Sequence, residues 1–256
     1  IIGGECASNP GPVSPFADML YIGDAEESLP ALLAAIQTGR AAGEERMVIL
    51  KRAASVKGVF VPALYERVHE DGWIGYRGTV VKKNAYRGEL KHTSRPLVPS
   101  IKVSHERCVV EISRGCRNLC NFCHAGFCML PYYEYDPAEV FGRAREQLQN
   151  TGFSEITLTA LSVSDYRQLG ELLNMSLPYF NENGISVSLP SMKVDRTNLP
   201  LIDAVSDIRH SSLTFAVESA DDEQRQSIHK KLSMDDLYGI IRTVYEDGWK
   251  LIKLYF

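Results

Sequence analysis

Apolar residues alternate between strand-like runs and helical stripes throughout the second half of the chain. The strand-like runs cover residues 108–113, 155–159, 185–189, 213–217 and 251–256. Between these runs, apolar residues recur at the spacing of a helix. The clearest stripes are Val140, Phe141, Ala144 and Leu148, then Leu169, Leu172, Leu173 and Leu177, and last Leu237, Ile240, Ile241 and Val244. A further short helix is expected over residues 198–208. Strands that alternate with helices predict an α/β fold with a parallel sheet. A partial (β/α) barrel of about five strands is the favoured architecture, and an open doubly wound sheet is the alternative.

Several helix ends carry their own signals. Asp136 is placed to cap a helix that begins at Pro137, with Glu139 completing a capping box and Gly152 just past the end. Pro178 predicts the end of the next helix, or a kink in it. Ser233 is placed to cap the last helix.

The first hundred residues are less regular and predict a different organisation. Residues 1–45 resemble the end of an α/β domain, with a strand over 19–24 and a helical stripe from Leu29 to Ile36 that Gly39 could terminate. Residues 46–104 have weaker periodicity and a basic stretch from Lys82 to Arg95, which favours a solvated linker or a small connecting sheet over an RNA contact. The expected domains are therefore 1–45, a connecting region 46–104, and a barrel portion 105–256.

Composition narrows the class of protein. Of 256 residues, 45% are hydrophobic and 23% are charged, which excludes disordered and collagen-like chains. No apolar run approaches the ~20 residues of a membrane helix. The formal net charge of −4 gives no electrostatic reason to expect nucleic-acid binding. Because apolar runs stand at both termini, we expect the chain to be part of a longer protein.

The spacing of three cysteines indicates a metal-binding site. Cys116, Cys120 and Cys123 form a Cys-x3-Cys-x2-Cys motif directly after the first strand of the regular half. Three thiolates can hold three irons of a [4Fe–4S] cube and leave the fourth iron open. The alternative is a structural zinc site completed by His124 or Cys128. Cys6 and Cys108 are expected to be buried small hydrophobic residues.

The motif and its setting resemble the radical S-adenosylmethionine (SAM) enzymes. The resemblance rests on Glu111-Ile112-Ser113-Arg114-Gly115-Cys116, on the triad that follows, and on Phe122 before the last cysteine. It implies that Cys116, Cys120 and Cys123 bind a [4Fe–4S] cluster whose open iron binds SAM. It also implies reductive cleavage of SAM to a 5′-deoxyadenosyl radical, with an electron from a reductant such as flavodoxin or ferredoxin.

The resemblance implies further cofactor-binding positions. The family's Gly-Gly-Glu-like turn is replaced here by residues 159–162, which leaves Ser162 as the candidate there, and Glu218 at the end of the fourth strand fits a ribose contact. After the third strand, Ser191 or Lys193 could enter the cavity. Arg225 or Lys230 could face the SAM carboxylate. An ordinary surface position is the competing interpretation for each of these polar residues.

The N-terminal residues also resemble one branch of this family. Gly3 and Gly4, the loop 9–12 and the turn 22–27 look like the last portion of a Rossmann-like, cobalamin-binding domain. Cobalamin is therefore implied, with Gly3 and Gly4 allowing close approach of the cofactor; plain loop glycines are the alternative.

The leading hypothesis is a cytoplasmic radical SAM enzyme of unassigned substrate, which could include a cobalamin-dependent methylation. A low-potential cluster fits a reducing compartment. Two alternatives stand beside it: a non-enzymatic binding module stabilised by zinc on Cys116, Cys120, Cys123 and Cys128, and an RNA methylthiotransferase that shares the triad.

Overall fold

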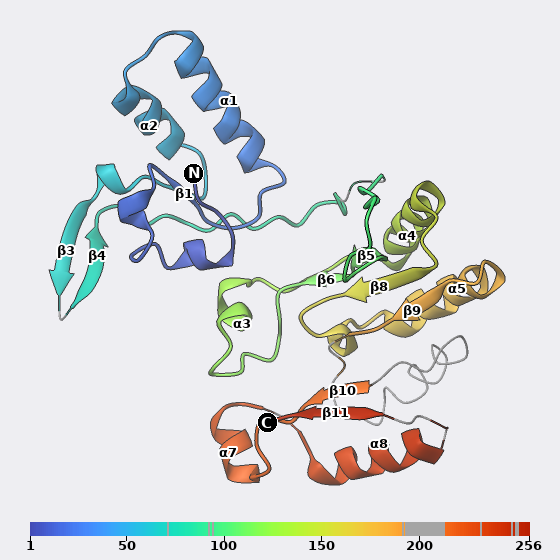
Figure 1. The fold of residues 1–256 in the computed structure, drawn as a ribbon. Helices are drawn as coiled ribbons and strands as arrows, with labels where there is room; N and C mark the ends of the chain where they lie inside the picture. Colours follow the sequence, from blue (N-terminus) through green and yellow to red (C-terminus); the bar gives the residue numbers. More distant parts are fainter. Residues whose placement is uncertain are drawn as a thin grey trace. The chain divides into compact units, whose positions relative to one another are not determined.

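The computed structural model describes residues 1–256 except 71, 92, 94, 191, 193–212, 231, 247 and 249–250. The chain divides into two compact units, residues 1–88 and 89–256. Both units combine helices and strands, so the predicted α/β class is confirmed (Figure 1). Within the described residues, no helix has both the length and the apolar character that crossing a membrane requires.

Unit 1 is a small α/β unit built around short strands. Its elements are, in order, η1 (Glu5–Ser8), η2 (Ser14–Phe16), β1 (Leu20–Tyr21), α1 (Ser28–Ala41), α2 (Arg46–Ala54), β2 (Val59–Phe60), η3 (Pro62–Leu64), β3 (Glu66–Glu70) and β4 (Trp73–Arg77). Strand β1 pairs antiparallel with β2, β3 and β4 form an antiparallel hairpin, and Ile2 makes a parallel bridge to Leu20. The main core of the unit packs Leu32 of α1 and Leu50 of α2 against Tyr21 and Val59.

Residues 46–88, for which the sequence predicts part of a solvated linker or a small connecting sheet, contain α2 and three strands, of which β3 and β4 form a two-stranded sheet. They belong to the same compact unit as residues 1–45. The end of α1 differs from the prediction. Gly39 does not terminate α1, which continues to Ala41. A Cβ on Gly39 would lie 2.6 Å from Cγ1 of Ile49, so this glycine permits the close approach of α1 and α2.

Unit 2 contains the regular βα series. Its elements are β5 (Cys108–Glu111), β6 (Ser113–Arg114), α3 (His124–Cys128), β7 (Tyr133–Glu134), α4 (Pro137–Thr151), β8 (Glu155–Thr159), η4 (Val163–Asp165), α5 (Leu169–Glu182), β9 (Ser186–Ser188), β10 (Leu213–Ala216), α7 (Asp222–Ser227), α8 (Met234–Glu246) and β11 (Ile252–Tyr255). Strands β5, β8 and β9 form a parallel sheet in that order, and β10 pairs parallel with β11 (Figure 1). The helix expected over 198–208 lies outside the described residues.

One hydrophobic core unites the strands and helices of unit 2. Val110, Ile156 and Leu158 of the sheet are at most 1% exposed. They share this core with Val140 and Leu148 of α4, and with residues of α5 and α8. The periodic stripes seen in the sequence are therefore the buried faces of these helices.

The ends of α4 and α5 show what sequence signals can and cannot determine. The Asp136 carboxylate accepts hydrogen bonds from the backbone N–H groups of Ala138 and Glu139, and Gly152 ends α4 in the left-handed conformation, as predicted. The reciprocal half of the capping box differs, because the Glu139 carboxylate accepts from the backbone N–H of Leu90. Pro178 does not end its helix: α5 continues to Glu182, held by the buried Phe180 beyond the proline.

Candidate functional site

The three clustered cysteines lie in a loop that leaves the sheet after β6. Pairing of β6 with β7 closes the base of this loop, with Arg114 opposite Tyr133. Gly115 begins the loop at φ +80°, and a Cβ there would lie 2.8 Å from the carbonyl oxygen of Met129. The loop ends at Cys123, whose sulfur caps α3 by accepting from the backbone N–H of Gly126 at 3.4 Å. The turn at Gly115 therefore requires glycine.

A cavity of about 360 Å³ brings the three thiols together with residues from the carboxyl ends of the strands. Leu161 and Ser162 follow β8, Met192 follows β9 and Glu218 follows β10. Strand β11 contributes Tyr255. The lining residues used below are Cys116, Cys120, Cys123, Phe122, Leu161, Ser162, Met192, Thr214, Glu218, His229, Lys230 and Tyr255. This is the edge where α/β folds place their functional residues.

Few polar side chains line this cavity, and two of them belong to residues with an unusual backbone conformation. Lys230 Nζ lies 3.3 Å from Glu218 Oε1, and both side chains are partly buried. Glu218 has φ +70° and His229 has φ +55°, a conformation that non-glycine residues seldom adopt. Ser162 Oγ is buried and has no hydrogen-bond partner among the described residues. Such an unsatisfied hydroxyl beside a cavity is suited to contact with a polar ligand.

The sulfur atoms have distinct surroundings. Burial raises the pKa of the Cys120 thiol, and the neighbouring Cys116 and Cys123 raise it further, whereas Lys230 opposes the shift. Cys116 Sγ accepts from the side-chain amide of Asn118 at 3.3 Å. Donors aimed at sulfur favour the charged thiolate, the form that binds metal.

The donor set of the cavity fits an iron–sulfur cluster. Three soft thiolates lie around one cavity, together with Glu218 and His229, and Cys128 and His124 are not among its lining residues. Cys128 Sγ instead lies 3.5 Å from His124 Nδ1. In the described part of the chain, no three His, Cys, Asp or Glu side chains converge where one ion could be held. A closed tetrahedral zinc site requires four ligands on one ion, whereas a cluster with one open iron requires three thiolates, the number that line this cavity.

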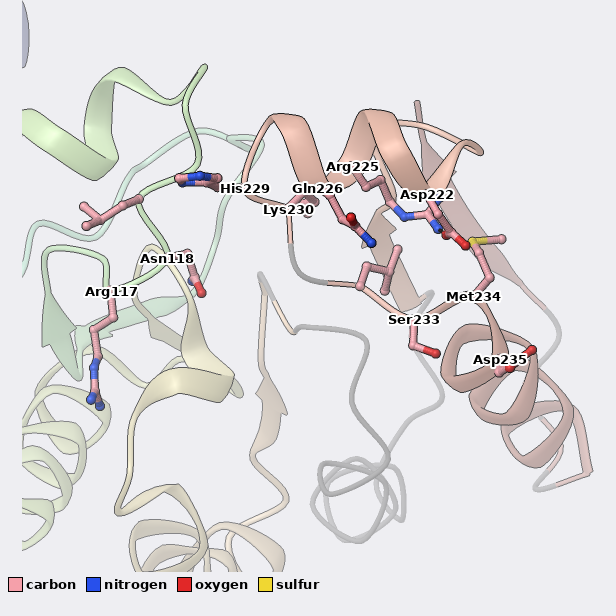
Figure 2. A pocket seen from close by; sticks show the side chains of 12 residues that line it. Arg117, Asn118, Asp222, Arg225, Gln226, His229, Lys230, Ser233, Met234 and Asp235 are labelled. Carbon is pink, nitrogen blue, oxygen red and sulfur yellow. Dashed lines mark ion pairs between the residues drawn. The ribbon is translucent and has the colours of Figure 1, made fainter.

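Arg225 lies in an adjoining cavity, separate from the thiols. This second cavity, of about 840 Å³, lies between the cysteine loop and the start of α8 (Figure 2). Lys230 lines both cavities. The Arg225 side chain is 1% exposed, pairs with Asp222 and donates to the carbonyl oxygen of Ser219. Of the two cations predicted to face the SAM carboxylate, the structure places Lys230 at the thiol-lined cavity.

The remaining predicted residues have varied positions. Phe122 lines the thiol cavity and is 55% exposed. Ser191 and Lys193 lie outside the described residues, and Gly3 and Gly4 belong to unit 1. Cys108 is buried as predicted, with Sγ 3.5 Å from Thr151 Oγ1. The prediction for Cys6 is wrong: it lies exposed in η1, whose one buried residue is Ala7.

Comparison with known families identifies the class of protein. Residues 110–255, more than half of the chain, match the family described as the radical SAM superfamily. Residues 1–62 match the family described as radical SAM proteins, N-terminal. The chain therefore belongs to the radical SAM superfamily of enzymes.

The chain is also similar to individual proteins and solved structures. An uncharacterised protein of Methanocaldococcus jannaschii is 28% identical over 148 residues, which are 58% of this chain and 32% of that protein. The solved radical SAM methyltransferase TsrM from Kitasatospora setae, with tryptophan substrate and a SAM analogue bound, superposes with a TM-score of 0.61 at 13% identity. The cobalamin-dependent SAM radical enzyme OxsB, with aqua-cobalamin bound, superposes with a TM-score of 0.56 at 13% identity.

The chain corresponds to only part of the length of each of these proteins. The chain spans about a third of the M. jannaschii protein, and 98% of it aligns with 48% of TsrM and 35% of OxsB. At 13% identity, the two solved structures show a shared fold.

Sequence reasoning missed several residues that line the thiol cavity. Met192, Thr214, His229 and Tyr255 all reach it, yet none belongs to a recognisable motif. Their common signal is position: Met192 follows β9, Thr214 and Tyr255 lie on strands, and His229 follows the short helix α7. A search for side chains at the carboxyl ends of the predicted strands would have found Met192 and Tyr255, because Thr214 lies near the amino end of β10.

Proposed function

We propose that Cys116, Cys120 and Cys123 hold a [4Fe–4S] cluster and that SAM binds at its open iron inside the 360 Å³ cavity. The observation that carries the proposal is the meeting of three thiols and the strand-end residues in one cavity. When bound, the cluster supplies one electron that splits SAM into methionine and a 5′-deoxyadenosyl radical. The electron comes from an external reductant such as flavodoxin or ferredoxin.

The side chains around the thiols are suited to hold a polar, charged molecule. Lys230 carries the positive charge that a SAM carboxylate would pair with, and Glu218 can accept hydrogen bonds from a ribose hydroxyl. Ser162 contributes a buried hydroxyl without a partner among the described residues. Phe122 and Leu161 supply apolar surface that excludes water from the reacting atoms.

The proposal is tested by anaerobic reconstitution of single-cysteine variants. The unchanged chain should bind about four irons and four sulfides and form 5′-deoxyadenosine from SAM with dithionite. Cys116→Ala, Cys120→Ala and Cys123→Ala should each abolish SAM cleavage, because each removes one of the three thiolates that line the cavity. Cys6→Ala is the matched control and should retain cleavage, since Cys6 lies in unit 1. Turnover by Cys120→Ala would contradict the ligand assignment.

The alternatives separate in the same experiment. Membership of an enzyme superfamily argues against the non-enzymatic zinc module. Cys128→Ser tests that module directly, because it would destroy an all-cysteine zinc site and leave a three-thiolate cluster intact. An RNA methylthiotransferase would need further cluster cysteines, and in unit 1 the only cysteine is the exposed Cys6. No observation favours that reaction here.

We further propose that unit 1 contacts cobalamin, as part of a methylation or another radical reaction. The support is the shared fold with TsrM and OxsB, whose structures contain cobalamin. Gly4 has φ +98° and no atom within 4 Å of an added Cβ, so a cofactor can approach the backbone of Gly3 and Gly4 there. Gly4→Val should weaken hydroxocobalamin binding in equilibrium dialysis. Equal binding by the variant and the unchanged chain would remove Gly4 from the proposal.

A further inference from the structure

Asn118 donates to the Cys116 sulfur through both of its nitrogen atoms. The backbone N lies 3.5 Å and the side-chain Nδ2 lies 3.3 Å from Cys116 Sγ. Among the residues that the structure describes, Cys123 Sγ accepts a hydrogen bond from the backbone N–H of Gly126. The Asn118 amide is therefore a sulfur donor that substitution can remove without changing the backbone.

Asp165 fixes the direction in which this amide points. Asn118 Nδ2 donates to Asp165 Oδ2 at 2.7 Å. An amide nitrogen carries two hydrogens, so one can serve the carboxylate while the other serves the sulfur. An ionised carboxylate only accepts hydrogen bonds, so it holds the amide nitrogen toward itself and turns the amide oxygen away from the thiolate.

The two partners come from different elements, and a second contact joins those elements. Asp165 is the last residue of η4, which follows β8, whereas Asn118 lies in the cysteine loop. Tyr132 Oη lies 3.0 Å from the Asp165 carbonyl oxygen, and the Arg117 guanidinium lies 5.4 Å from the centre of the Tyr132 ring. Tyr132 thus links Arg117, the residue before Asn118 in the cysteine loop, to η4.

We propose that Asn118 and Asp165 form a positioning pair that sets the reduction potential of the cluster bound through Cys116, an inference that rests on the proposed function. Hydrogen bonds to ligand sulfur stabilise negative charge on it. The reduced cluster carries one more negative charge than the oxidised cluster, so such a bond favours reduction. Loss of the Asn118 amide makes the potential more negative, and loss of Asp165 releases the amide from its orientation.

The test measures the reduction potential of the reconstituted full chain, with EPR to follow the reduced cluster. Asn118→Leu removes the donor at nearly constant size and should shift the potential to a more negative value at unchanged iron content. Asn121→Leu is the matched control from the same loop: the Asn121 side chain is exposed and donates to the Ser227 carbonyl oxygen at 2.9 Å. Its potential should equal that of the unchanged chain. Equal potentials for all three proteins would overturn the inference.

A double-mutant cycle tests whether Asp165 acts through Asn118. Asp165→Asn removes a negative charge both in the unchanged chain and in the Asn118→Leu variant. It can change the orientation of the Asn118 amide only in the chain that still has Asn118. The shift caused by Asp165→Asn should therefore differ between the unchanged chain and the Asn118→Leu variant. The same shift in both would show that Asp165 acts only as a nearby charge, and the pair would be rejected.

Failure of this inference differs from failure of the proposed function. If the unchanged chain binds no cluster, the proposed function fails. If it binds a cluster that responds to SAM but Asn118→Leu leaves the potential unchanged, only the positioning pair fails. Loss of iron from both Asn118→Leu and Asn118→Ala, with iron retained by Asn121→Leu, would also overturn the inference, because Asn118 would then be needed for cluster binding itself.

Discussion

Gly115 is the single residue on which the shape of the cysteine loop depends most. Its φ of +80° and the 2.8 Å approach of the Met129 oxygen leave no room for a side chain. Gly115→Ala should lower the free energy of unfolding by at least ~1–2 kcal/mol, the cost of a left-handed alanine, and should reduce iron content. Thermal unfolding and iron determination measure both effects.

Gly142 supplies the control for that substitution. It lies exposed within α4, and a Cβ there would meet no atom within 4 Å. Gly142→Ala should stabilise the chain by about 0.5–1 kcal/mol, because alanine is the better helix former. If Gly115→Ala retained full iron content and stability, the described loop geometry would be wrong.

Tyr166 links the stability of unit 2 to pH. Burial raises the pKa of its phenol, the nearby carboxylates of Glu134 and Asp136 raise it further, and Oη donates to the Tyr135 carbonyl oxygen at 2.8 Å. The unfolded state ionises this group as pH rises through about 10, whereas the folded state keeps it neutral, so stability falls above that pH.

Tyr166→Phe should therefore cost about 1–2 kcal/mol at pH 7, because the Tyr135 carbonyl loses its partner. The difference from the unchanged chain should shrink between pH 7 and pH 10.5, since phenylalanine does not ionise. Denaturant unfolding at the two pH values measures this difference in the free energy of unfolding. Tyr238→Phe is the control, because Tyr238 is 61% exposed. A difference that stays constant with pH would contradict the argument.

For individual residues of the site, the sequence predicts the role of those that belong to a motif. It misses the residues whose role depends on tertiary contacts. The Cys-x3-Cys-x2-Cys spacing predicted three clustered thiols, which line one cavity, and the resemblance to radical SAM enzymes indicated Glu218, which lines the same cavity. Nothing in the local sequence connects Asn118 with Asp165, 47 residues further on. Arg225 was named for its charge, which the fold uses in the pair with Asp222.

Helix α4 shows how a local signal specifies an element. Asp136→Ala removes the acceptor for the N–H groups of Ala138 and Glu139 and should lower the free energy of unfolding by about 1 kcal/mol. Asp136→Asn keeps an acceptor and should have little effect, because asparagine caps about as well as aspartate. Chemical denaturation compares the two. Equal losses would mean that the charge, and not the cap, stabilises the helix.

For the other elements, the sequence predicts that a helix or strand forms more accurately than it predicts where that element begins and ends. The limits of β8 and α4 agree with the sequence pattern, where capping residues and β-branched residues are local. The local sequence favours a helix end at Gly39 and an end or a kink at Pro178. Both helices continue past these residues, because packing against Ile49 in one case and burial of Phe180 in the other overrides the local preference. Helix α2 was not predicted, because it exposes much of its surface, including Met47 and Val48.

At the scale of the whole molecule, all residues of the thiol cavity belong to one unit. Unit 2 has its own hydrophobic core, and every lining residue falls within residues 89–256. A chain of residues 89–256 alone should therefore bind the same iron and sulfide as residues 1–256. Iron and sulfide determination on both proteins measures this. Cluster loss from the shorter chain, with its helical content unchanged by circular dichroism, would show that unit 1 contributes to the site.

The most direct test of the account is EPR of the reduced, reconstituted chain recorded with and without SAM. Three thiolates leave one iron without a protein ligand, so SAM can bind to that iron directly. The account predicts a [4Fe–4S]⁺ signal whose g values shift when SAM is added. A signal that SAM leaves unchanged, or stoichiometric zinc in place of iron, would contradict it.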